Sequence, residues 1–128
     1  MKICLLILAA LTAPNPNPTP VADTSLALTN LGGRAITPLR AAGKRPAVLV
    51  FITHDCPVSN KMIPEIRRIA KDFEGKVQFT LVYADPESGH KSLAKHQTEF
   101  ALGKLASVHD RKHQLVRAVG ATVTPEAV

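Results

Sequence analysis

The most informative pattern in the chain is an unbroken apolar run followed closely by an amphipathic stretch. Residues 46–53 are mostly apolar and rich in β-branched side chains, which is typical of a strand buried on both faces. In residues 62–73 apolar side chains recur at helical spacing, and basic side chains fill many of the other positions. We therefore predict a strand over 48–53, a helix over about 57–73 that Gly75 ends, and a turn between them.

The rest of the chain continues to alternate between the two patterns. A second apolar run predicts a strand over 77–83, and the polar stretch after it predicts a helix that reaches about Leu102. Shorter elements are expected as strands over 25–28, 35–39 and 106–109 and as a helix over 111–119. Strands that alternate with helices imply a mostly parallel sheet covered on both faces, so we predict an α/β domain over 24–128.

The first residues have a different character from the domain. A positive start is followed by an apolar run over 3–11, by small residues and by a Pro/Asn-rich tract. This order predicts a secretory signal peptide over 1–13 and an extended spacer over 14–23, and hence export to the periplasm or another extracytoplasmic space. The apolar run is shorter than the roughly 20 residues of a membrane span, so no span is expected after cleavage. An uncleaved anchor and an ordinary buried start are the alternatives.

The cysteines carry the main chemical signal. Cys4 lies in the apolar run and would leave with a signal peptide, so the mature chain would hold Cys56 alone and no internal disulfide. An unpaired cysteine in an exported protein suggests a reactive thiol or an intermolecular bond, whereas a buried and inert cysteine is the plainer alternative. Because Cys56 opens the predicted helix, free N–H groups and the helix dipole would favour its thiolate, and we predict a reactive thiol.

The charge distribution argues against nucleic-acid binding. The formal net charge is +6, but the basic residues are spread along the chain without a dense block. Tyr83 is the only tyrosine and tryptophan is absent, so stacking aromatic side chains are scarce. We predict a solvated basic surface and no nucleic-acid partner.

Two segments resemble a known family. Residues 56–64, Cys-Pro-Val-Ser-Asn-Lys-Met-Ile-Pro, resemble the active-site helix of thioredoxins, in which a nucleophilic cysteine opens a helix that a proline kinks eight positions later. Residues 118–126 look like the same family's segment around a cis-proline. The match in order and spacing covers about 24–128 and is closest to the exported redoxins, which include thiol–disulfide oxidoreductases and alkyl hydroperoxide reductase/thiol-specific antioxidant proteins. The resemblance implies a thioredoxin-like fold, with a central mixed sheet flanked by helices.

The resemblance also implies roles for individual residues. Pro125 would be cis, pack beside Cys56 and shape the groove that receives a disulfide or peptide, which Pro57 and Thr124 would also line. The remaining predicted site residues would tune or orient the thiol: Thr53, His54 and Ser59. A protonated His54 would lower the pKa of Cys56.

The chain departs from dithiol oxidoreductases at three positions. Ser59 stands where a second cysteine would resolve the mixed disulfide, so resolution would need an external thiol or protein. Val50 replaces the buried acid that thioredoxins use for proton transfer. Asp55 replaces a tryptophan, and its charge would raise the pKa of the thiol.

A peroxiredoxin-like pattern is the competing match. Thr53 and Pro57 fit around Cys56, but Leu49 replaces the first proline of that motif and residues 124–126 lack the arginine that would bind peroxide. One-cysteine peroxidase activity, in which the thiol is oxidised to sulfenic acid, is therefore our second hypothesis.

Metal binding is a further alternative. His54 and Cys56 could bind a soft metal, but the second cysteine of copper-delivering relatives is missing, so we predict no metal and no cofactor. The other histidines are interpreted as surface residues, and two acidic residues as turn or helix-start positions: His90, His96, His109 and His113, and Asp85 and Glu87.

The family fold would continue beyond this sequence. After the cis-proline it adds two strands and a closing helix, whereas the chain stops at Val128, where the first of those strands should begin. We interpret the chain as a fragment, with a degenerate domain or strands supplied by a partner as alternatives. The strand over 48–53 would then form a sheet edge.

The combined hypothesis is a thiol-based redox protein. Its nucleophile is Cys56, its substrates are a protein disulfide, a small thiol or a peroxide, and an external reductant resolves the intermediate. A non-catalytic binding or metal-handling module with a redoxin fold is the non-enzymatic alternative.

Overall fold

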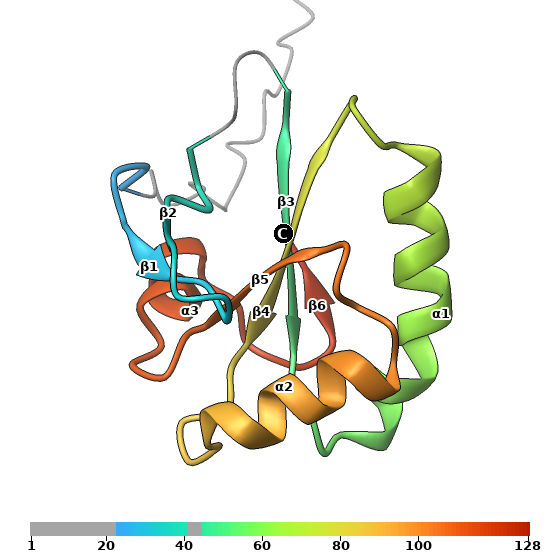
Figure 1. The fold of residues 1–128 in the computed structure, drawn as a ribbon. Coiled ribbons are helices and arrows are strands. Elements are labelled where there is room, and N and C mark those ends of the chain that lie inside the picture. Colours follow the sequence, from blue (N-terminus) through green and yellow to red (C-terminus); the bar gives the residue numbers. More distant parts are fainter. Residues whose placement is uncertain (1–22, 41–44) are drawn as a thin grey trace, which may run out of the picture.

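The computed structural model describes residues 23–40 and 45–128, so the predicted signal peptide lies outside the described residues. Within these ranges the chain forms a four-stranded sheet of order β5-β4-β3-β6 and a separate two-stranded sheet, β1-β2 (Figure 1). The strands are β1 Leu28–Thr29, β2 Ala35–Ile36, β3 Ala47–Ile52, β4 Gln78–Tyr83, β5 Ala106–His109 and β6 Glu126–Ala127. The helices are α1 Pro57–Asp72, α2 His90–Glu99 and α3 Gln114–Val119.

The sheet is mixed. β3 is parallel to β4 over six residue pairs, from Ala47 opposite Gln78 to Ile52 opposite Tyr83. β5 is parallel to the last four residues of β4, whereas β6 is antiparallel to β3. Because parallel strands β3 and β4 end at the same edge, the turns that follow Ile52 and Tyr83 lie next to each other.

Each face of the sheet has its own apolar layer. Alternate residues of β3 and β4 point to opposite faces, so both strands are apolar throughout. One layer joins the sheet to α1 and α2, and the other joins it to α3 and the β1-β2 pair, on opposite sides of the sheet in Figure 1. The buried members are Val50, Ile52, Ile63, Leu81, Tyr83, Leu93 and Leu102 in the first layer, and Leu49, Phe51, Val82, Val108 and Leu115 in the second.

β3 is paired on both sides, whereas the sequence predicted that one side would be a bare sheet edge. β6 contacts Val50 and Phe51 in antiparallel register, and Val128 exchanges two backbone hydrogen bonds with Leu49, at 2.8 and 2.9 Å. The last residues of the chain therefore already protect the middle of the apolar strand.

Element ends differ from the predictions for identifiable reasons. α1 ends at Asp72 with Phe73 as its C-cap, so the prediction that Gly75 ends the helix is wrong; Gly75 lies in the following turn with φ +78°. α3 begins at Gln114 rather than at 111, because the buried carboxylate of Asp110 accepts the backbone N–H of Gln114 at 2.6 Å. In the segments that the structure describes, no helix combines the length and apolarity that a membrane crossing requires.

Candidate functional site

Cys56 is the N-cap residue of α1. Its backbone is extended, with φ −77° and ψ 115°, and its N–H donates to the Thr53 carbonyl at 3.3 Å, which closes a tight turn after β3. Pro57 occupies the start of the helix, where its missing N–H costs nothing. The Cys56 Sγ accepts the backbone N–H of Ser59 at 3.5 Å, in the way that an oxygen of a normal N-cap would.

This position lowers the pKa of Cys56 below the ordinary thiol value. The largest cause is the hydrogen bond from the backbone N–H of Ser59. The Ser59 side chain, the Val58 backbone and the Thr53 side chain lower the pKa further, whereas partial burial of the thiol raises it. The Ser59 Oγ is fully buried and, apart from its favourable interaction with the Cys56 thiolate, has no hydrogen-bond partner among the described residues. This hydroxyl is therefore available to a thiolate on Cys56. Asp55, which we expected to raise the thiol pKa, is exposed and is not among the causes.

The side chain of His54 is held by an acid from the neighbouring turn. Asp85 accepts the backbone N–H of His54 at 3.2 Å, and its Oδ1 lies 3.0 Å from the ring Nδ1. The hydroxyl of Ser88 lies 3.1 Å from the same nitrogen. The causes that lower the thiol pKa are hydrogen bonds within the turn and first helical residues, so a contribution from His54 stays a prediction.

The interpretation of Asp85 as a simple turn residue is wrong. Its side chain is only 7% exposed and joins the β4-α2 turn to the turn that carries Cys56. The same turn is fixed by two histidines that we had placed on the surface. His109 contacts the Asp85 carbonyl at 2.6 Å and His113 contacts the Ala84 carbonyl at 3.1 Å, both through Nε2 and both half-buried.

His96 is also misplaced by the sequence pattern, because it is buried rather than exposed. The residue is 4% exposed, and its ring packs against Phe100 at 4.6 Å between centroids and hydrogen-bonds at both nitrogens. Nδ1 lies 2.9 Å from the hydroxyl of Tyr83, and Nε2 lies 2.8 Å from Oδ1 of Asn60. By contrast, His90 is exposed as predicted, and its Nε2 lies 2.8 Å from the Leu31 carbonyl.

A small hollow lies beside the turn on the other face of the sheet. It has a volume of about 330 Å³ and brings Thr53, at the end of β3, together with Thr124. The remaining lining residues are Phe51, Ala84, His113, Val116, Ala121, Thr122 and Val123. The Thr124–Pro125 peptide bond is cis, as the resemblance implies, and Pro125 is half-buried.

One group of side chains near the turn has the composition of a metal site. His54, Asp55 and Asp85 offer ligand atoms within 4.8 Å of one another, a nitrogen and oxygen set that borderline divalent cations accept. Cys56 is not in this group. His54 and Asp85 also contact each other directly, with Nδ1 of His54 3.0 Å from Oδ1 of Asp85.

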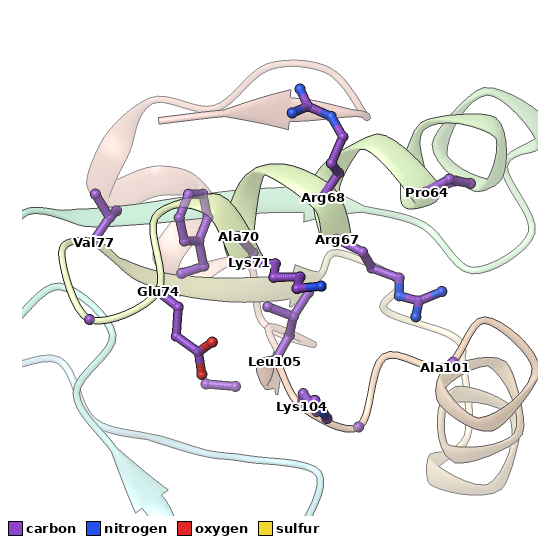
Figure 2. A pocket seen from close by; sticks show the side chains of 14 residues that line it. Pro64, Arg67, Arg68, Ala70, Lys71, Glu74, Val77, Ala101, Lys104 and Leu105 are labelled. Atoms are coloured by element: carbon purple, nitrogen blue, oxygen red, sulfur yellow. The ribbon is translucent and has the colours of Figure 1, made fainter.

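A larger hollow lies elsewhere (Figure 2). It measures about 820 Å³ and lies between α1, the first residues of β4 and the α2-β5 loop, at the end of β4 remote from Cys56. Its lining includes the basic side chains of Arg67, Lys71 and Lys104 and the apolar side chains of Phe79 and Leu105. No residue of the Cys56 turn lines it, so the size of a hollow does not mark the reactive site here.

Comparisons with known proteins agree with this fold. A family model described as AhpC/TSA family matches residues 20–128, whereas no curated protein matches the chain significantly. Among solved structures, MTB dsbF is similar with a TM-score of 0.72 and 17% identity, over 81% of this chain and 75% of that one. A secreted Mycobacterium tuberculosis disulfide oxidoreductase homologous to E. coli DsbE has a TM-score of 0.70 and 19% identity, over 80% and 73%. A thiol-disulfide oxidoreductase from Bacteroides fragilis has a TM-score of 0.64 and 16% identity, over 80% and 77%. The predicted thioredoxin-like fold is confirmed.

Proposed function

We propose that this chain, which belongs to the AhpC/TSA family, uses Cys56 as the nucleophile of thiol–disulfide exchange. Membership of this family supports a redox function, and the specific step is our inference from the site. The observation that carries it is the Cys56 Sγ at the N-cap of a 16-residue helix, where the Ser59 N–H lies 3.5 Å away and lowers the thiol pKa. The thiolate is the attacking species in disulfide exchange, so this position raises the reactive fraction at neutral pH.

The proposed step is a direct displacement at sulfur. The Cys56 thiolate attacks one sulfur of a substrate disulfide, a new S–S bond forms as the old one breaks, and the released thiolate takes a proton from water. Because Ser59 cannot displace the bound sulfur, a second, external thiol must attack the mixed disulfide and regenerate Cys56. The buried and unpartnered Ser59 hydroxyl can instead donate to the Cys56 thiolate before attack and after release.

Exposed apolar residues near both parts of the site favour a protein or peptide substrate. Val58 and Met62 on the first turns of α1 are 58% and 45% exposed, and Val123 before the cis-proline is 63% exposed. We assign the groove to the residues that the resemblance named, Pro57, Thr124 and Pro125. The 330 Å³ hollow beside Thr124 is large enough for a side chain of a bound peptide.

A one-cysteine peroxidase is the second candidate. The observation that favours it is Thr53, whose side chain helps to lower the pKa of Cys56, as the peroxiredoxin-like pattern predicts. Against it, no arginine or lysine is among the groups that lower this pKa or line the adjacent hollow in the described part of the chain. We therefore rank disulfide exchange first.

We also propose an extracytoplasmic location. The support is the sequence pattern of a signal peptide over 1–13 and the description of one structural neighbour as secreted. Amino-terminal sequencing of the protein from a host's extracytoplasmic fraction tests this directly. A new terminus near residue 14 is expected, and an intact Met1 in a cytoplasmic fraction would contradict the proposal.

The function is tested with the full chain carrying Cys4→Ser, so that Cys56 is the only thiol. Oxidised glutathione and a disulfide-linked peptide are offered in parallel with hydrogen peroxide, and the adducts are resolved by mass spectrometry. The proposal expects a mixed disulfide with one or both disulfides, its release by dithiothreitol, and no adduct in the Cys56→Ser variant. Sulfenic acid that forms with peroxide far faster than in free cysteine, without disulfide reactivity, would support the peroxidase instead.

A further inference from the structure

A chain of buried hydrogen bonds connects α2 to the turn that carries Cys56. Tyr83 at the end of β4 contacts Nδ1 of His96, and Nε2 of His96 contacts Oδ1 of Asn60. The Asn60 Nδ2 then donates to the His54 carbonyl at 3.1 Å. We call this chain, from Tyr83 through His96 and Asn60 to the His54 carbonyl, the His96 bridge.

The partners fix where the protons lie along the His96 bridge. Asn60 uses Nδ2 to donate to a carbonyl, so its Oδ1 is the acceptor that faces His96. His96 must therefore donate through Nε2–H, which leaves Nδ1 to accept the hydroxyl proton of Tyr83. Every bond has one donor and one acceptor when His96 is neutral, and burial of the ring lowers its pKa in the same sense.

The His96 bridge ends on the peptide group that sets the position of the thiol. Asn60 binds this turn twice, because its backbone N–H donates to the Cys56 carbonyl at 3.0 Å while its side chain holds the His54 carbonyl. Asp85 holds the His54 N–H from the other side. The residue two positions before Cys56 is thus held at both its N–H and its C=O.

We propose that His96 and Asn60 are positioning residues for Cys56: through the His54 carbonyl they hold the turn in the conformation that presents Sγ to the Ser59 N–H. This inference rests on the proposed function of Cys56 and extends it, because it makes α2, more than 30 residues away in sequence, part of the thiol site. The His96 bridge fixes the thiol without touching it.

Packing alone does not require these polar residues. α2 already contributes the fully buried Leu93 to the apolar layer, and an apolar side chain at 96 would pack against Phe100 without hydrogen-bond partners. A buried imidazole is costly unless both of its nitrogens are satisfied, as they are here. The polar bridge therefore contributes a specific geometry at its far end, the His54 carbonyl.

The experiment measures the pH dependence of Cys56 alkylation in full-chain Cys4→Ser protein and in the same protein with Asn60→Ala, His96→Leu or His96→Gln. The first two changes should move the half-point up by about half a pH unit, which is about a threefold loss of thiolate at neutral pH. Glutamine at 96 can still donate to Asn60, so it should recover part of the shift. His90→Leu on the exposed side of α2 is the matched control and should change nothing.

The outcomes separate this inference from the function on which it rests. If the Cys4→Ser parent has a lowered half-point that the folded Asn60→Ala and His96→Leu proteins share, the His96 bridge does not position the thiol, although the thiol function survives. If the parent half-point is not lowered, both proposals fail. Nitrogen-15 NMR of the histidine rings adds a test that does not depend on the variants folding: the Nε2–H tautomer is expected for His96, and the Nδ1–H tautomer would overturn the His96 bridge.

Discussion

The two ends of strand β4 contrast in how their polar groups are used. At its carboxyl end, Tyr83 and Asp85 are buried and hydrogen-bonded to His96 and His54 in an interlocking set. At its amino end, the 820 Å³ hollow carries Arg67, Lys71 and Lys104, all exposed (Figure 2). In the described segments these three cations have no ion-pair partner.

The difference shows which property marks the reactive site. Burying a polar group is unfavourable unless each donor and acceptor is satisfied, so a dense set of buried bonds fixes one conformation at the carboxyl end. Solvated charges around an open hollow impose no such geometry. Cys56 lies at the ordered end, although the larger hollow lies at the other.

Loss of the nucleophile should produce the largest contrast between the two ends. Cys56→Ser should reduce disulfide exchange by about 10³-fold or more, to the background rate, because an alcohol at this position cannot replace the thiolate. Lys71→Ala in the large hollow should retain the parent rate. Initial rates with oxidised glutathione, measured for both variants, check this prediction. An equal loss of rate in the two variants would show that both ends of β4 contribute to the reaction.

Removing the acid that holds the turn should give the next largest effect. Asp85→Ala leaves the His54 N–H without its partner and leaves the ring Nδ1 with the Ser88 hydroxyl alone, so the free energy of unfolding should fall by about 2 kcal/mol. Glu87→Ala, an exposed acid in the same turn, is the control and should leave it unchanged. Urea unfolding followed by circular dichroism measures both variants. An unchanged free energy of unfolding in Asp85→Ala would show that the contact between Asp85 and His54 does not stabilise the fold.

Removing the Tyr83 hydroxyl, at the other end of the His96 bridge, should have a smaller effect on stability. Tyr83→Phe keeps the buried ring but removes the hydroxyl proton that Nδ1 of His96 accepts, so the free energy of unfolding should fall by about 1 kcal/mol. The same urea experiment applies, with the parent protein as reference. A stability equal to that of the parent would mean that the hydroxyl contributes nothing to the fold.

Acid should weaken the ordered end through His96. Burial lowers the pKa of His96 most, His54 lowers it further, and Asp85 and Glu99 act in the opposite direction. In the unfolded chain the pKa of a histidine is about 6.5, so below this pH the unfolded state binds a proton at His96 more readily than the folded state does. The free energy of unfolding should therefore fall as the pH drops from 7 to 5. Unfolding at both pH values in the parent and in His96→Gln tests this. The variant should show a smaller loss, and an identical loss would assign the effect to other groups.

The smallest effect is expected from the exposed ion pairs of α1. Arg68 lies 2.6 Å from both Glu65 and Asp72, but all three side chains are about half exposed. Solvent screening makes such pairs weak, so Arg68→Ala should leave the urea midpoint unchanged within error. A clear loss of stability would mean that the cationic end of the molecule is more ordered than its solvated charges indicate.

Local sequence patterns predicted one half of the site and missed the other. The strand, the turn, the cysteine and the helix are contiguous, so hydrophobic periodicity and the residues of 56–64 were sufficient to locate them. Asp85 follows a strand and precedes a proline, which is the pattern of an ordinary turn residue. Its burial arises only because β3 and β4 are parallel neighbours and end side by side, 31 residues apart in sequence.

His96 shows the same limit in a helix. The residues around it in α2 are polar, so periodicity favoured exposure, whereas its partners come from β4 and α1. The later start of α3 has a similar origin, since Asp110 becomes a buried acceptor for the first backbone N–H groups of α3 only after β5 has joined the sheet. Pairings between distant segments decide these positions, and no local pattern encodes them.

The central claim is that the first turn of α1 makes Cys56 a stabilised thiolate. The most direct measurement is the pH titration of thiolate absorbance at 240 nm in the full chain carrying Cys4→Ser, with Cys56→Ser added as the blank. A midpoint clearly below the free-thiol value of about 8.5 is predicted, because the Ser59 N–H and the helix start favour the anion. A midpoint at or above that value would contradict the account and leave Cys56 as a structural residue.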